Sequence, residues 1–196
     1  MSSMKEIVID WRKSNMPNHV ENILKIKGTK EEIKEVKDFL KGKYNDETER
    51  NIDFNNITPM PKWVYRGDLS SREMEKYGKK NCWYGWSHKN WGTKWNAYES
   101  EYKDTENTIR FRTAWNNVFD ELMRKLGFIF PNVEFEYSWS DENFGYNVGR
   151  IRFKDTEILD DYIPKGGTEE AYKLTEEIWE DINIKEYLKE IEEEEE

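Results

Sequence analysis

Mixed apolar and polar positions along the first part of the chain predict a strand followed by a helix. Residues 19–27 have the apolar and polar mixture of a half-buried β-strand. Thr29 and Glu32 have the spacing of a capping box, so a helix is expected to begin there and to end near Gly42. The buried face of this helix is expected to consist of Ile33, Val36, Phe39 and Leu40. A short strand is predicted over residues 52–55, before two prolines interrupt regular structure.

The middle of the chain carries the same kinds of signal. A second capping box at residues 70–73 predicts a short helix that Gly78 ends. Residues 108–113 alternate apolar and charged side chains, which indicates a strand. A helix is predicted over residues 115–126, with Gly127 as its cap. Its buried stripe is expected to consist of Trp115, Val118, Phe119, Leu122 and Leu126.

The last part of the chain has the clearest alternation. Residues 133–139 alternate aromatic or aliphatic side chains with polar ones, and a turn over residues 140–145 leads to a strand over residues 146–153. In that last strand the apolar residues change from even positions (Tyr146 and Val148) to odd positions (Ile151 and Phe153), which predicts a β-bulge at Gly149. One long helix is predicted from Thr168, with apolar positions at Ala171, Leu174, Ile178, Ile182, Tyr187, Leu188 and Ile191.

The order of these elements predicts an α+β fold. Two strand–helix units around one antiparallel-dominated sheet are typical of a ferredoxin-like split β-α-β sandwich. Residues 16–167 would form this domain, with an aromatic insertion at about 56–105. Residues 1–15 would be an N-terminal extension that could add an edge strand. Residues 168–196 would be an acidic C-terminal helix with a Glu tail.

An aromatic block at residues 81–98 is the leading candidate for a binding site. We expect it to be an ordered, ring-packed segment and not a helix, because Gly85 and Gly92 interrupt any regular period. Rings interleaved with cations suit single-stranded nucleic acid, and also suit protein hot spots. Packing of the rings into the core is the structural alternative. The candidate binding residues are Trp83, Trp86, His88, Trp91, Lys94, Trp95 and Asn96.

The charge of the chain is concentrated at one end. The chain has 41 acidic and 31 basic side chains, a formal net charge of -10. Residues 168–196 hold thirteen of the acids and only three lysines, so the first 167 residues are neutral. The acidic segment is interpreted either as a solvated tail or as an arm for a basic partner. The candidate acidic partner surface consists of Glu176, Glu177, Glu180 and Asp181.

Five short motifs occur in one order along residues 16–153. They are MPNHVEN (16–22), FNNITPMP (54–61), WGTKWNA (91–97), TAW (113–115) and GYNVG (145–149). Together they resemble the YubB-type ferredoxin-like domain family, found in proteins of bacteriophages, plasmids and bacteria. The resemblance implies a ferredoxin-like fold and a mobile-element setting, and it supplies no catalytic residues to carry over. Residues 1–15 and the acidic helix after Thr168 lie outside the shared motifs.

The sequence offers little for catalysis, metals or cofactors. His19 and His88 are the only histidines and have no zinc-type spacing, while the single Cys82 is expected to be a packing residue. Asp141 and Glu142 are expected to be solvated turn residues, not metal ligands or an acid–base pair. We therefore expect no cofactor, no metal and no enzyme activity.

No signal peptide or apolar run long enough for a membrane span is present, so a cytoplasmic protein of a bacterial host is expected. The leading functional hypothesis is a non-enzymatic interaction protein encoded by a phage or mobile element. It would bind a host protein and thereby inhibit a host defence nuclease system. The alternative is a single-stranded nucleic-acid-binding protein that uses the aromatic block. A small enzyme is the third hypothesis. The sequence leaves the oligomeric state open.

Overall fold

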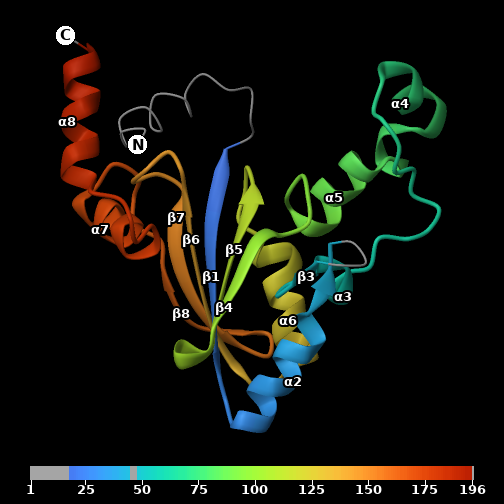
Figure 1. The fold of residues 1–196 in the computed structure, drawn as a ribbon, viewed down its shortest axis with the longest axis horizontal. Helices are drawn as coiled ribbons and strands as arrows, with labels where there is room; N and C mark the ends of the chain where they lie inside the picture. The colour runs from blue at the N-terminus through green and yellow to red at the C-terminus, as the bar shows by residue number, and fades with distance from the viewer. Residues whose placement is uncertain (1–17, 45–47, 196) are drawn as a thin grey trace.

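The computed structural model describes residues 18–44 and 48–195, so the predicted extension at residues 1–15 lies outside the described residues. Within them, six strands form one antiparallel sheet in the order β4-β5-β1-β6-β7-β8 (Figure 1). These strands are β1 (His19–Lys27), β4 (Tyr98–Lys103), β5 (Thr108–Ala114), β6 (Glu134–Asp141), β7 (Val148–Lys154) and β8 (Glu157–Tyr162). A separate hairpin pairs β2 (Gly42–Lys43) with β3 (Glu49–Arg50).

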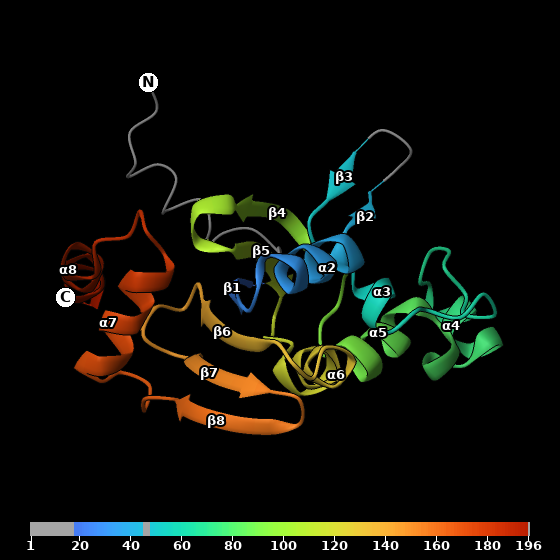
Figure 2. The same ribbon diagram turned by 90° about the horizontal axis from the view of Figure 1, so that it is seen from below.

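Helices cover both faces of the sheet (Figures 1 and 2). On one side lie α2 (Lys30–Leu40), α3 (Phe54–Ile57), and α6 (Arg124–Ile129) with the π-helix η3 (Phe119–Met123) before it. On the other side lie α7 (Glu169–Ile178) and α8 (Ile184–Glu195). The remaining short elements are α4 (Ser71–Tyr77), α5 (Trp83–Trp91) and the 3-10 turns η1 (Lys79–Asn81) and η2 (Asp104–Glu106). The prediction of an α+β fold is confirmed.

The central strand β1 divides the molecule into two cores, because successive side chains of a strand point to opposite faces. Val20, Leu24 and Ile26 are fully or almost fully buried and face α2 and α6 in the larger core. Ile23 points the other way, into a smaller core beneath α7 and α8. That smaller core consists of Phe144, Val148, Ala171, Leu174, Ile178, Trp179 and Ile184.

A buried polar brace ties the central strands together. The hydroxyl of Tyr137 donates to Oδ1 of Asn22 at 2.5 Å and accepts from the backbone N–H of Val118 at 3.0 Å. The amide nitrogen of Asn22 donates to the backbone oxygen of Val20 and to Oγ1 of Thr113. Both Tyr137 and Asn22 have no exposed surface, so every bond of this brace is shielded from water. It links β1, β5 and β6 to the segment that enters η3.

Two predictions about the early helices are wrong. Residues 52–55 are not a strand, because Asp53 caps α3 by accepting a hydrogen bond from the backbone N–H of Asn55 at 2.9 Å. The helix α2 does begin with the predicted capping box at Thr29. Gly42 is not its cap, however, because α2 ends at Leu40, its C-cap residue is Lys41 with a negative φ, and Gly42 belongs to the hairpin.

Later helix boundaries also differ from the predictions. The predicted helix over residues 115–126 begins only at Phe119, as a π-helix, and Gly127 lies inside α6 where its Cα packs close to a backbone oxygen of the β7–β8 turn. The pairing of β6 with β7 is continuous, so there is no bulge at Gly149. Gly149 instead faces Trp139, whose ring would lie 2.5 Å from an added Cβ. The apolar positions of β7 change phase because Val148 is buried in the smaller core on one face of the sheet, whereas Ile151 and Phe153 are buried in the larger core on the other.

The predicted long C-terminal helix is two helices. Thr168 caps α7 as expected, but α7 ends at Ile178 and α8 begins at Ile184. The break allows the Trp179 indole to donate to the backbone oxygen of Ser140 at 3.3 Å, and it buries Ile184. The edge strand β8 was not predicted, because all six of its side chains are exposed and give no alternating pattern.

Candidate functional site

The aromatic block contains a helix, contrary to the prediction. The helix α5 runs from Trp83 to Trp91 and ends at Gly92, whose φ of 76° places it in the left-handed conformation that favours glycine. Gly85 lies inside the helix, where an added Cβ would meet the backbone oxygen of Lys79 at 2.2 Å. Both glycines therefore serve helix packing and termination, which the sequence pattern did not reveal.

Three of the predicted binding tryptophans have structural contacts. Trp86 and Trp91 belong to the larger core, with 7% and 4% of their surface exposed, and their rings meet edge-to-face at 5.3 Å. The indole of Trp91 donates to the backbone oxygen of Thr58 at 2.8 Å. Trp83 is partly buried and donates to the backbone oxygen of Gly67 at 3.2 Å. These contacts correspond to the packing alternative.

The remaining rings line up along the surface as a continuous strip. Tyr84 meets His88 edge-to-face at 4.7 Å, and His88 stacks on Trp115 with centroids 5.3 Å apart and planes 22° from parallel. The ammonium of Lys94 lies 4.8 Å from the Trp115 ring centre and 4.4 Å from that of Trp95. All are half-buried or exposed, so part of each faces solvent. With Tyr98, which meets Trp95 at 6.4 Å, we name this set the ring strip: Tyr84, His88, Trp115, Lys94, Trp95 and Tyr98.

Trp115 joins the ring strip because of its backbone conformation. It was predicted to lie on a buried helix stripe, but it precedes the π-helix and has a φ of 77°. A non-glycine residue in this region costs on the order of 1–3 kcal/mol, and such strain clusters at functional sites. The backbone N–H of Trp115 donates to the oxygen of Asn18 at 2.8 Å, which fixes this conformation. The strained turn therefore presents the indole to His88 and Lys94.

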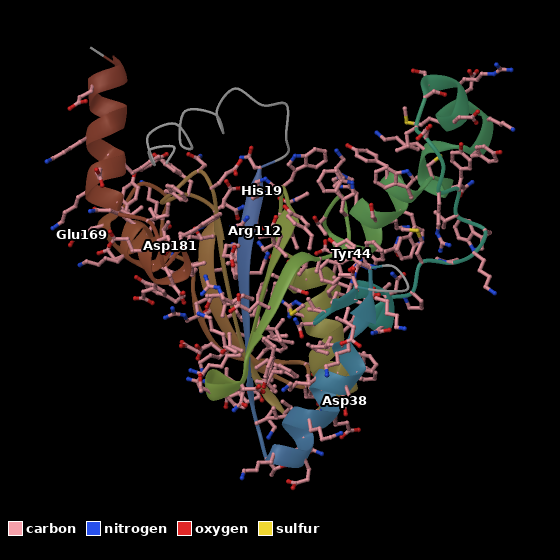
Figure 3. The ribbon with its side chains drawn as sticks, viewed as in Figure 1. His19, Asp38, Tyr44, Arg112, Glu169 and Asp181 are labelled. Carbon is pink, nitrogen blue, oxygen red and sulfur yellow. The ribbon has the colours of Figure 1, made fainter. Side chains whose placement is uncertain are left out.

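A recess of about 340 Å³ lies at the Trp95 end of the ring strip. We name it the ring recess, and it is lined by His19, Tyr44, Arg50, Trp95, Asn96 and Tyr98. His19, at the start of β1, shares a hydrogen bond of 2.5 Å through Nδ1 with the Tyr98 hydroxyl. Arg50 stacks on Tyr44 at 3.9 Å, yet its Nε is buried and has no hydrogen-bond partner. Figure 3 shows His19 and Tyr44, which reach this region from β1 and from the β2–β3 hairpin.

Asn96 shapes the ring recess through its own hydrogen bonds. Its Oδ1 accepts from the backbone N–H groups of Phe54 and Ala97, at 3.0 and 2.9 Å. Its amide nitrogen donates to Oδ1 of Asp53 at 2.7 Å. Both ends of the side chain are therefore engaged within the protein, and Asn96 positions the wall between α3 and β4.

The electrostatics of the ring strip combine fixed cations with uncharged rings. Burial lowers the pKa of His88 below its ordinary value of 6.5, and the nearby charges of Lys94 and Lys79 lower it further. Its ring is thus neutral at pH 7, and its buried Nε2 has no partner. Burial, aided by Glu99, holds the pKa of Tyr98 far above the ordinary value of a phenol. The fixed positive charges at the site are then Lys94 and Arg50, accompanied by neutral rings.

The predicted acidic partner surface is largely engaged within the chain. Glu177 pairs with Arg150 at 2.6 Å, and Glu180 pairs with Arg110 at 2.8 Å and with Lys103 at 3.0 Å. Glu176 accepts from the backbone N–H of Ile184 at 3.0 Å, which ties α7 to α8. Asp181 is exposed and lies on the α7 side of the sheet, away from Tyr44 (Figure 3). The acidic helix is therefore bound to basic side chains of the sheet.

The predicted turn acids differ in burial. Asp141 is 6% exposed and accepts hydrogen bonds from the backbone N–H of Asn143 and the side chains of Asn18 and Asn147, so it is not a solvated residue. Burial raises the pKa of Glu142, whose backbone N–H donates to the oxygen of His19 at 3.0 Å. The ring contacts of His88 are to Tyr84 and Trp115, so no His88–carboxylate dyad is formed among these contacts.

Other classes of site find no support in the described residues. They contain no group of three or more His, Cys, Asp or Glu side chains arranged to hold a metal ion. None of their helices is long and apolar enough to cross a membrane. Cys82 is 1% exposed and its thiol lies 3.5 Å from the backbone oxygen of Gly78, as expected for a packing residue.

Sequence reasoning missed the residues that complete the site. Tyr44 and Arg50 come from a hairpin of two-residue strands, and no sequence signal connects them with Trp95 about fifty positions later. Tyr84 lies in the aromatic block but was not among the candidate binding residues, and Trp115 was assigned to a buried helix stripe. The motif that contains Trp115 was quoted for the resemblance, which is the one signal that could have indicated a role beyond the core.

Residues 94–193 match the family model described as the ferredoxin-like domain in Api92-like protein. The match covers just over half of the chain and runs from Lys94 through most of α8. It therefore includes the acidic helices, which the five sequence motifs had left outside the shared region. Comparison with curated proteins and with solved structures found no match. Together with the antiparallel sheet, the family match confirms the predicted ferredoxin-like fold. The chain belongs to the family of ferredoxin-like domains of Api92-like proteins.

Proposed function

We propose that this protein is a non-catalytic binding module that takes single-stranded nucleic acid along the ring strip. The observation that carries the proposal is the series of rings joined by Lys94, which lies over both Trp115 and Trp95. Single-strand binding proteins combine aromatic platforms for bases with cations for phosphates. Each base stacked on a ring contributes about 1–3 kcal/mol of binding free energy in such sites, whichever base it is.

The charge distribution supports this proposal in spite of the net charge of -10. The acidic excess lies in the C-terminal segment, where Glu177 and Glu180 pair with sheet arginines on the α7 side. The ring strip has Lys94 between its rings, and Lys79 is close enough to lower the pKa of His88. A phosphate chain would therefore meet Lys94 and Lys79 beside the rings, although the protein as a whole is acidic.

The proposal is tested by fluorescence anisotropy with an end-labelled oligothymidylate of about ten nucleotides, a length within the usual range for such sites. Trp95→Ala and Trp115→Ala should each weaken binding by about 1–3 kcal/mol, which is fivefold or more. Trp63→Ala is the matched control, because Trp63 is 64% exposed and lies outside the ring strip. Equal affinities for all three variants, or no binding at low salt, would reject the proposal.

A second candidate function is the binding of a host protein by a phage or mobile-element product, with interference in a host defence nuclease system. The supporting observation is the edge strand β8, which exposes Ile158 and Leu159 at 40% and 41%, followed by Tyr162 and Ile163. Exposed apolar side chains on an unpaired edge are typical of protein contacts. Affinity capture from a bacterial host lysate should then recover a specific protein, and Leu159→Lys should abolish the capture. A partner retained by that variant would exclude β8 as the contact.

A further inference from the structure

The guanidinium of Arg50 indicates a ligand in the ring recess. Arg50 is only 8% exposed, it lines the recess, and its Nε has no hydrogen-bond partner. A buried donor without an acceptor is costly, and a charged one more so. Its stacking on Tyr44 at 3.9 Å holds the planar group in place. A fixed, unpaired guanidinium is a site for a carboxylate or a phosphate, the groups whose geometry matches its donors.

The walls of the recess narrow the class of ligand. Three of its six lining residues are Tyr44, Trp95 and Tyr98, so rings surround the space beside Arg50. Its volume of about 340 Å³ is at the lower end of the range for small-molecule sites. This space has room for a planar ring together with an anion, whereas a bare anion would leave most of it empty. A nucleotide has both parts.

Two acids beside the recess, Glu99 and Asp53, have partners inside the protein. Glu99 is paired with Arg112 at 2.5 Å, and Asp53 accepts hydrogen bonds from the side chains of Asn96 and Asn55. Their charges are therefore partly compensated by partners inside the protein. Arg50 lines the recess, stacks on Tyr44 and has a buried Nε without a hydrogen-bond partner, so no acid neutralises it in these contacts.

We propose that the ring recess binds the phosphomonoester of a nucleotide, with the phosphate on Arg50 and the base against Trp95 and Tyr98. This rests on the proposed function, because the recess shares both rings with the ring strip and would receive the end of a bound strand. A terminal phosphate carries a charge of about −1.5 to −2 at pH 7, against −1 for an internal phosphodiester, so the buried guanidinium selects the end of a strand.

The experiment is isothermal titration calorimetry with two sets of probes. The first set is three oligothymidylates of about ten nucleotides, with hydroxyl ends, with a 5′-phosphate and with a 3′-phosphate. The second set is thymidine and its 5′- and 3′-monophosphates. One phosphorylated oligonucleotide should bind about tenfold tighter than the hydroxyl-ended one, and the corresponding monophosphate should bind about tenfold tighter than thymidine.

Variants assign that preference to Arg50. Arg50→Gln should reduce the phosphate preference to about one, because the remaining contacts do not distinguish a phosphorylated end from a hydroxyl end. Arg66→Gln is the matched control, because the Arg66 side chain is exposed and donates to the backbone oxygen of Met60, outside the recess. If Arg50→Gln does not fold, the comparison of thymidine with its monophosphates on the unaltered protein still decides the question.

Each outcome bears on one of the two proposals. Equal affinities for all three oligonucleotides, with monophosphates no better than thymidine, would overturn the phosphate site and leave strand binding intact. Binding of a monophosphate without binding of any oligonucleotide would keep the phosphate site, with a free nucleotide as its ligand, and reject the proposed function. No binding by either set would reject both.

Discussion

Replacing Tyr137 by Phe should be among the most destabilising single-atom deletions in this protein. The change removes only the hydroxyl oxygen and leaves the buried ring in place. That oxygen donates to Oδ1 of Asn22 at 2.5 Å and accepts from the backbone N–H of Val118 at 3.0 Å. Without it, an acceptor on β1 and a donor at the entry to η3 lose their partner in a region with no exposed surface.

The magnitude follows from these two orphaned groups. Each buried polar group left without a partner costs about 1–3 kcal/mol, so the sum lies between about 2 and 6 kcal/mol. The removed hydroxyl no longer has to be desolvated, which places the expected value in the lower half of that interval. Natural domains are stable by only about 5–15 kcal/mol, so this loss is a large share of the total.

Urea denaturation followed by far-ultraviolet circular dichroism measures the change. Tyr137→Phe should lower the midpoint of unfolding with an unchanged slope. Tyr102→Phe is the control, because the half-buried Tyr102 hydroxyl donates a long hydrogen bond, 3.3 Å, to Oδ1 of Asn107 and does not belong to the buried brace. If the two variants differed from the unaltered protein by the same small amount, the buried brace would have no special weight and the reasoning would be refuted.

Three further predictions concern packing, charge and the ring strip. Gly149→Ala should destabilise the protein by about 1–3 kcal/mol in the same assay because its Cβ would lie 2.5 Å from the Trp139 ring. Gly28→Ala should cost less, because its closest contact is the end of the Glu32 side chain, which can move at the expense of one exposed capping hydrogen bond. Glu177→Gln should change stability by less than about 1 kcal/mol, since its pair with Arg150 is half-exposed, and a larger loss would contradict this. Because an anion favours the charged imidazolium of His88, oligonucleotide affinity should rise as the pH falls below 6.5, and His88→Gln should remove that rise; a pH dependence that survives the substitution would argue against it.

Elements with local signals could be predicted from the sequence. The capping box at Thr29 and Glu32 specifies the start of α2 through bonds between residues three positions apart. The alternation at residues 133–139 predicts β6 because every second side chain enters the larger core. In both cases the physical cause lies within a few residues of the element, so a pattern in the sequence is enough.

Elements that depend on distant contacts could not be predicted in this way. Gly85 interrupts the aromatic block in sequence, yet it is required inside α5 because η1 packs against that position. The strand β8 has no buried side chain at all, and it forms only because β7 offers it a pairing edge. The break between α7 and α8 depends on the place of Trp179 in the smaller core.

The candidate site was predicted in part, and for a physical reason. Lys94 and Trp95 were selected as interleaved cation and ring, and both belong to the ring strip. Arg50 was not selected, because its significance comes from burial without a partner, which a sequence does not record. For the same reason the sequence could not distinguish the buried Trp91 from the exposed Trp95, although both lie in one motif.

The most direct test of strand binding along the ring strip is a nuclear magnetic resonance titration of the indole N–H signals. The chain has nine tryptophans, and substitution assigns each signal. On addition of an oligothymidylate, the signals of Trp95 and Trp115 should move together and saturate, while those of the buried Trp86 and Trp91 should move little. Signals of Trp95 and Trp115 that remain fixed at saturating oligonucleotide would contradict the account.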